Sequence, residues 1–219
     1  MTATLPSELR DVFARSTTAE LVTIDADGRP VARSVSPSYH QGGMCIDIDA
    51  LDAAVSEPRV AIVFAQADPM VLVQGTAHAE DVLHVRPERV YAWSADDPTA
   101  EPRLFDAHLE EVRSGHNEEP EIGHPGPEGG GAVWDERLDG LDTALLACVG
   151  PDGFPFAAQL AIEPDPDSRM LRFPRLPIGM PVEPGPACLH PAGGGARVHG
   201  DLVAGPEGWG LLPHAVVDD

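Results

Sequence analysis

The sequence contains no lysine, so all 14 of its basic residues are arginines, against 36 acidic residues and a formal net charge of −22. Without a lysine amine the protein can form no internal Schiff base, which excludes pyridoxal phosphate carried in that way. So few positive charges also argue against a basic face for nucleic-acid phosphates or for an anionic membrane surface. We therefore expect neither nucleic acid nor a membrane as a partner.

Cysteine is also scarce: Cys45, Cys148 and Cys188 are far apart, and none of them forms a Cys-x-x-Cys motif. The sequence therefore predicts no zinc knuckle and no redox dithiol, and the apolar neighbours of each cysteine predict three small buried side chains. No uncharged apolar run approaches the length of a membrane span, and no basic and apolar leader is present. These features favour a cytoplasmic protein.

What the sequence does contain is a series of short, strand-like segments. Residues 6–16 are typical of an amphipathic helix, and segments 20–25 and 29–35 flank the pair Asp27-Gly28, a strong signal for a β-hairpin. Further strands are expected at 42–49, 59–65 and 70–82, with a brief helix at 51–58. From about residue 94 to 131 the chain is rich in Pro, Glu, Gly and Asp, with one helical stretch at 102–115.

An internal repeat relates the two halves of the chain. Thr18–Ala32 (TAELVTIDADGRPVA) and Thr143–Ala157 (TALLACVGPDGFPFA) share Thr-Ala, Asp-Gly and the following proline at an offset of 125. EPRVAI and EPGPAC match at 126, VQG and VHG at 125, and RPERV and LPHAV at 126. Four anchors at nearly one offset indicate a tandem duplication. We predict a first unit at 1–93, an acidic connector at 94–133 and a diverged second unit at 134–219.

The segments LVTIDADGRPVARSV, EPRVAIVF and VLVQGTAHAED are similar, in order and spacing, to the pyridoxamine 5'-phosphate oxidase-like FMN-binding split β-barrels. The resemblance implies a mainly β split barrel, here as two tandem copies forming a pseudo-dimer within one chain, with a helical, acidic connector. It also implies FMN in the groove between the copies and an FMN-dependent oxidoreductase acting on a small organic substrate, the chain being a monomer or a homodimer. The cofactor-binding residues expected on this basis are Arg33, Ser34, Ser36, Arg59 and Gln74.

Within that set, strand alternation places Arg33 and Ser34 on opposite faces, and we expect Arg33 to face the phosphate because guanidinium can bind it in a bidentate manner. Where the family has a cationic step, this chain has Asp47, Asp49 and Asp52. Phosphate binding would then need a second cation, either Arg59 or an arginine of the second copy.

No residue stands out as a specific acid or base, so whether the protein is an enzyme is left open. Two alternatives to the flavin also stay open: a haem-binding protein, which would need a groove histidine such as His78 or His199, and a non-catalytic binding module that has lost the flavin. In the last case a small-molecule ligand would occupy the groove between the copies.

Overall fold

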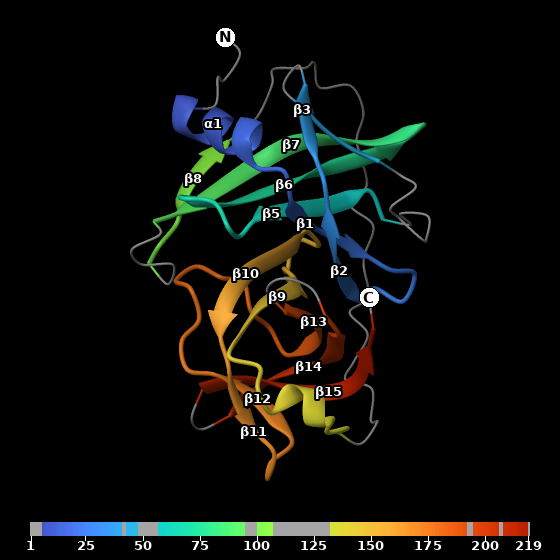
Figure 1. Cartoon of the computed structure of the whole chain (residues 1–219), viewed down its shortest axis with the longest axis vertical. Coiled ribbons are helices and arrows are strands. Elements are labelled where there is room, and N and C mark those ends of the chain that lie inside the picture. The colour runs from blue at the N-terminus through green and yellow to red at the C-terminus, as the bar shows by residue number, and fades with distance from the viewer. Residues whose placement is uncertain are drawn as a thin grey trace.

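The computed structural model describes residues 6–40, 43–47, 57–94, 100–106, 132–191, 195–205 and 208–218. The protein is mainly β: among these residues a single α-helix, α1 (Ser7–Arg15), accompanies two curled antiparallel sheets, one above the other (Figure 1). No described helix is both long and apolar enough to cross a membrane. Most of the brief helix expected at 51–58 lies outside the described residues.

The two sheets have the same topology. The first has the strand order β2-β1-β5-β6-β7-β4-β3, with β8 added beside β7, and the second has the order β10-β9-β13-β14-β15-β12-β11. The strands of the first sheet are β1 (Ala19–Ile24), β2 (Pro30–Val35), β3 (Ser38–His40), β4 (Gly43–Asp47), β5 (Arg59–Phe64), β6 (Met70–Ala79), β7 (Val82–Trp93) and β8 (Arg103–Asp106). Those of the second are β9 (Thr143–Val149), β10 (Pro155–Ala161), β11 (Glu163–Asp165), β12 (Met170–Phe173), β13 (Gly185–Pro191), β14 (Arg197–Gly205) and β15 (Gly208–Val217).

The first hairpin turn recurs at the predicted offset. Gly28 has φ 78° and Gly153 has φ 76°, a left-handed conformation that glycine adopts at little cost. Each turn is closed by the same backbone hydrogen bond, from Asp25 N to Arg29 O in one copy and from Gly150 N to Phe154 O in the other, both 2.9 Å. The Asp-Gly hairpin predicted from the sequence is confirmed.

A β-bulge also recurs, in β6 after Gln74 and in β14 after His199. The next residue is a glycine in both copies, Gly75 and Gly200, and a Cβ on either would approach a facing backbone carbonyl oxygen closer than 3.0 Å. A proline, Pro87 or Pro213, pairs with each glycine. Proline lacks a backbone N–H, but it is tolerated here because the bulge already interrupts the hydrogen bonds between the two strands. The match of VQG to VHG therefore reflects equivalent positions in the two sheets.

The pairing of strands corrects one part of the repeat alignment. Val60 pairs with Gly75, and Ala187 pairs with the equivalent Gly200, so β5 and β13 correspond at an offset of 127 rather than 126. The counterpart of Arg59 is consequently Pro186, one residue beyond the position that the sequence match gave.

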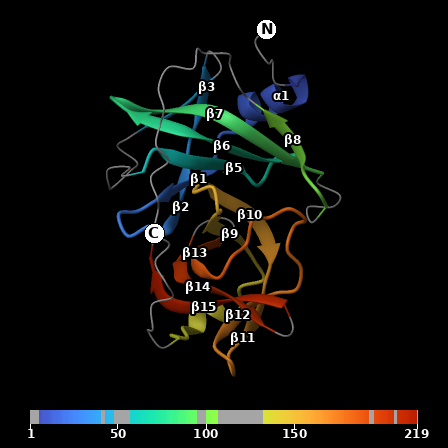
Figure 2. The same ribbon diagram turned by 180° about the vertical axis from the view of Figure 1, so that it is seen from behind.

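The two copies pack against each other through reciprocal contacts. Strand β2 contacts β9 and β13, and the equivalent β10 contacts β1 and β5, as in an isologous dimer (Figures 1 and 2). One face of the first sheet, with residues such as Leu21 and Ile62, packs under α1. Its opposite face, with Val22 and Leu72, joins the core of the second copy. The interface between the copies is therefore a continuous hydrophobic core, which supports the two-copy architecture; the predicted unit boundaries themselves stay predictions.

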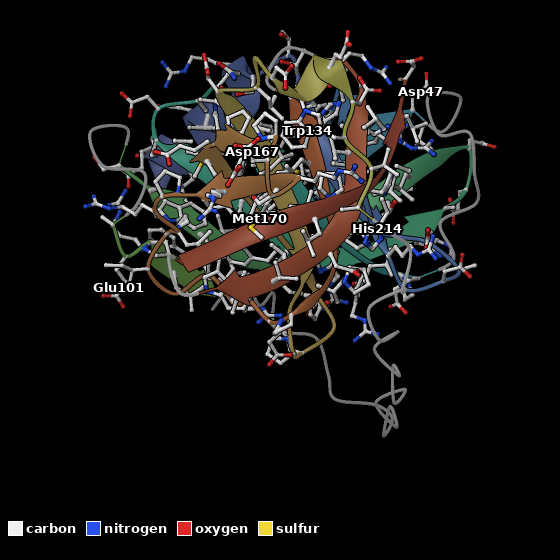
Figure 3. All side chains as sticks on the ribbon, turned by 90° about the horizontal axis from the view of Figure 1, so that it is seen from below. Asp47, Glu101, Trp134, Asp167, Met170 and His214 are labelled. Carbon is white, nitrogen blue, oxygen red and sulfur yellow. The ribbon has the colours of Figure 1, made fainter. Side chains whose placement is uncertain are left out.

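Two further contacts fix parts of the second copy. Met170, near the centre of Figure 3, lies over Gly210 of β15, whose lack of a side chain leaves room for the methionine sulfur. Trp134 packs against the shared core, and its indole N–H donates to Asp139 Oδ1 at 2.9 Å. The first contact fixes the start of β12 against β15, and the second holds the segment before β9 beside the shared core.

The helical connector predicted from the sequence is wrong at its start. Residues 103–106 form β8, which pairs with residues 89–92 of β7, whereas the remainder of the expected helix lies outside the described residues. The physical reason is that, among the described residues, β4 pairs only with residues 82–85 of β7, which leaves the edge of the far half of that long strand for β8 to complete.

Candidate binding site between the two copies

Two cross-strand rows, one from each sheet, lie at the interface between the copies. In the first sheet Glu20 on β1 pairs with one residue on β2 and one on β5, and in the second sheet Leu145 on β9 pairs in the same way with β10 and β13. The first row is Ser34, Glu20 and Val63, and the equivalent second row is Gln159, Leu145 and His190. Because equivalent residues come together across the interface, the rows straddle the pseudo-two-fold axis.

All six residues line one pocket, which we call the axial pocket. Its volume is about 500 Å³, and its remaining lining is mostly small or uncharged. The full lining comprises Thr18, Ala19, Glu20, Ser34, Val63, Ala65, Gln66, Leu145, Gln159, His190 and Pro191. Neither copy supplies this lining alone, so the pocket depends on both.

A polar chain crosses the interface at one wall of the pocket. Ser34 Oγ donates to Glu20 Oε1 at 2.9 Å, and His190 Nδ1 lies 2.9 Å from Glu20 Oε2. The imidazole is 1% exposed and the glutamate side chain 20% exposed. The His–Glu contact is close but poorly aligned, because Oε2 is buried without a well-directed donor among the described residues. Glu20 is thus a carboxylate near the interior with acceptor capacity left over.

At another part of the interface, side chains of the first copy hold the turn of the second copy. Gln74 Nε2 donates to the carbonyl of Pro155 at 2.8 Å, and Arg59 Nη1 donates to the carbonyl of Asp152 at 3.1 Å. Arg89 Nη1 lies 2.6 Å from Asp152 Oδ2, and its guanidinium stacks on the Phe154 ring, 4.5 Å from the centroid. We call this arrangement the turn clamp. A side chain at the turn glycine would collide with the Arg59 guanidinium.

In the part of the chain that the structure describes, the turn clamp occurs on one side of the interface only. The positions equivalent to Arg59, Gln74 and Arg89 are Pro186, His199 and Ala215, which supply no equivalent pair of guanidinium groups. Burial, aided by the nearby charge of Arg197, lowers the pKa of His199. The divergence of the second copy has therefore made the interface asymmetric.

The structure separates the five cofactor-binding residues predicted from the sequence. Ser34 lines the axial pocket, whereas Arg59 and Gln74 belong to the turn clamp. Arg33 pairs with Leu21, so its side chain starts from the sheet face that packs under α1, and it does not line the pocket. Ser36 lies beyond the end of β2 and is exposed. The predicted alternation of residues 33 and 34 is confirmed, but the residue facing the axial pocket is the serine.

These residues do not fit a flavin phosphate in the axial pocket. The described lining contains no arginine, and its serine hydroxyl already donates to a carboxylate. Arg59 is engaged by Glu57, with Nε–Oε1 2.8 Å, and this hydrogen bond lowers the pKa of Glu57. A phosphate here would face Glu20 with no guanidinium beside it. FMN binding elsewhere on the molecule stays a prediction.

The histidines considered for haem lie in different environments. His78 is 77% exposed and its Nε2 lies 3.4 Å from Glu80 Oε1, on the molecular surface. His199 is half-buried beside the first hairpin turn. Haem binding through either residue stays a prediction.

The prediction of three buried cysteines is wrong for one of them. Cys148 and Cys188 are buried, but Cys45 is half-exposed, and its Sγ lies 3.4 Å from Nδ1 of His84 on the neighbouring strand β7. The apolar residues beside Cys45 in sequence point to the opposite face of β4, because side chains alternate along a strand.

Sequence reasoning missed Glu20, His190 and Arg89 as interface residues. A signal for the first two was present: Glu20 is the one carboxylate of its strand and His190 the one imidazole of its own, and the equivalent position in the other copy, Leu145 or Val63, is apolar. A comparison of the two copies position by position would have found them. Neither a family model nor a curated protein matches the chain.

Proposed function

We propose that the protein is a non-catalytic binding module whose ligand is a small organic molecule held in the axial pocket. The observation that carries this proposal is the pocket itself, whose volume of about 500 Å³ lies within the range usual for small-molecule sites. Its position on the pseudo-two-fold axis also gives a reason for the fusion of two copies in one chain, because each copy supplies one row of the wall.

The geometry supports binding more than chemistry at this site. In a serine nucleophile system the imidazole accepts the hydroxyl proton directly. Here the order is different, since Ser34 donates to Glu20 and His190 lies on the other oxygen of that carboxylate. The partner of the Ser34 hydroxyl is therefore the Glu20 carboxylate rather than an imidazole that could act as a base. The contacts from Ser34 through Glu20 to His190 orient polar groups at one wall of the pocket, but they do not activate the serine as a nucleophile.

The flavin-dependent oxidoreductase implied by the sequence resemblance stays a separate prediction. When bound, FMN would supply electron transfer, and the protein would bind and orient it. Absorbance spectra of the purified protein before and after addition of FMN, repeated with Arg33→Ala, test this prediction. Flavin bands that weaken in the variant would support it, whereas a protein that does not bind FMN would contradict it.

The binding proposal is tested with N-phenyl-1-naphthylamine, a neutral apolar dye that fluoresces when it leaves water. We expect saturable fluorescence with one dye per chain. Gln159→Trp should fill the pocket and weaken binding by about tenfold or more, equivalent to about 1.4 kcal/mol. Gln159 suits this purpose because it lines the pocket from the edge strand β10 and is not fully buried.

The matched control is Ile178→Trp, which adds the same indole at a position 60% exposed and outside the pocket lining. Dye affinity should be unchanged in this control. Absence of saturable binding, or equal binding by both tryptophan variants, would contradict the proposal.

A further inference from the structure

The two rows that line the axial pocket differ in chemistry although they are equivalent in position. Glu20 lies against His190, and the two-fold relation converts this pair into Leu145 and Val63. Both members of the second pair are buried in the shared core. The axial pocket consequently has one polar wall and one apolar wall, whereas a symmetric homodimer would have two identical walls.

Charge distinguishes the polar wall further. Among the described residues of the lining, Glu20 is the only acidic one and none is an arginine. An anionic ligand would therefore meet a carboxylate, while a ligand cation would be attracted to it in surroundings less polar than water. Ser34 and His190 each contact one oxygen of Glu20, and a carboxylate oxygen can accept more than one hydrogen bond.

We propose that the ligand of the axial pocket is an organic amine, with its ammonium group on Glu20 and its apolar body against Leu145 and Val63. This inference rests on the proposed binding function and specifies the class of ligand. Glu20 and Gln159 both line the pocket, and ammonium N–H groups can donate to a carboxylate oxygen, which accepts more than one hydrogen bond, and to an amide oxygen. The apolar wall accepts a hydrocarbon body of the ligand, and the asymmetry permits only one orientation.

The test compares ligands of nearly equal shape and different charge. 2-Phenylethylamine, 2-phenylethanol and phenylacetate are each used to displace N-phenyl-1-naphthylamine from the full chain. The amine should reach half-displacement at a concentration about tenfold lower than the alcohol, and phenylacetate should be the weakest. The result is expressed, for each variant, as the half-displacement concentration of the alcohol divided by that of the amine. A change in dye affinity alters both concentrations by the same factor and leaves this ratio unchanged.

In Glu20→Gln this ratio should fall to about one, because the amide keeps the shape of the side chain and removes its charge. Glu163→Gln is the control: it removes an exposed carboxylate on β11, outside the pocket, and should keep the wild-type ratio. A ratio near one in the wild type would overturn the amine assignment while dye binding left the binding function in place. A ratio that survives in Glu20→Gln would overturn the role of Glu20, and absence of dye binding would overturn the proposed function itself.

Discussion

Glu20 and His190 illustrate how a single pair of residues can make two equivalent surfaces different. They lie 2.9 Å apart across the interface, in positions where the other wall has Leu145 and Val63. The imidazole is almost completely buried, so its partner matters: a buried polar group left without one costs about 1–3 kcal/mol. In principle, leucine at position 20 and valine at position 190 would copy the apolar pair, Leu145 and Val63, that the same molecule has at the equivalent positions.

This leads to a double-mutant cycle. His190→Val alone should lower the free energy of unfolding by about 2 kcal/mol, because the buried Oε2 of Glu20 loses the imidazole beside it while Oε1 keeps Ser34. Glu20→Leu alone should also be destabilising, because it removes the carboxylate that lies 2.9 Å from the buried His190 imidazole. The double variant, which copies the apolar wall, should be more stable than the sum of the two single effects predicts, with a coupling of about 1–2 kcal/mol. Urea unfolding followed by circular dichroism measures all four proteins, and strict additivity would contradict the pairing.

Cys45 differs from the other two cysteines because its thiol is accessible and lies beside an imidazole. Burial raises the pKa of the Cys148 thiol to about 12, so that thiol is almost entirely protonated at neutral pH. With iodoacetamide under native conditions, we expect one rapid equivalent of label, located at Cys45 by peptide mass spectrometry.

His84→Ala should slow this labelling, because the Nδ1 beside the sulfur can accept the thiol proton as the sulfur attacks the reagent. His78→Ala is the control, since His78 lies next to His84 in the sheet and contacts Glu80 instead of the thiol. Equal labelling rates at the buried cysteines, or an unchanged rate in His84→Ala, would contradict the assignment.

At the scale of strands and turns, the features that repeat are those with strict backbone requirements. The Asp-Gly hairpin was predictable because its glycine needs a left-handed conformation in both copies. The strand β7 was not predicted, since Pro87 and its charged neighbours Arg86, Glu88 and Arg89 interrupt the apolar pattern. Its proline is tolerated because it stands opposite the bulge glycine Gly75, a partner that local sequence does not reveal.

The bulge glycines provide a prediction at this scale. Gly75→Ala and Gly200→Ala should each lower the free energy of unfolding by about 2–3 kcal/mol, because the added Cβ would press on a backbone carbonyl that cannot rotate away. Gly140→Ala is the control, with no heavy atom within 4 Å of the added Cβ. Thermal unfolding of the three variants tests this, and a bulge variant as stable as the control would count against the packing described.

For the whole molecule, the sequence predicts the mainly β class and two related copies, but not which side chains meet between them. Arg59 and Gln74 were predicted from the sequence as cofactor-binding residues, and that role stays a prediction; their contacts with the turn of the second copy, whose residues lie far away in sequence, were not predicted. Contacts between the copies depend on how two sheets pack. Local patterns fix the face on which a residue lies and leave its partner in the other copy unspecified.

The turn clamp gives a prediction for the assembled chain. Asp152→Asn should lower the free energy of unfolding by about 1 kcal/mol at low salt, because it removes the charge that Arg89 contacts. Added salt should reduce the difference by screening the ion pair. Asp27→Asn, at the equivalent place in the first turn, is the control and should have little effect. An equal loss of unfolding free energy in both variants would show that the contacts of the turn clamp do not stabilise the protein.

The most direct test of the central claim is a crystal structure of the protein with 2-phenylethylamine. We expect the ammonium nitrogen at about 2.8 Å from Glu20 Oε1, the distance usual for a charge-assisted hydrogen bond, and the phenyl ring between Leu145 and Val63. Density for the amine in the axial pocket in this single orientation would support both the pocket and its polarity. A pocket that stays without the amine, or an amine bound with its nitrogen away from Glu20, would contradict the account.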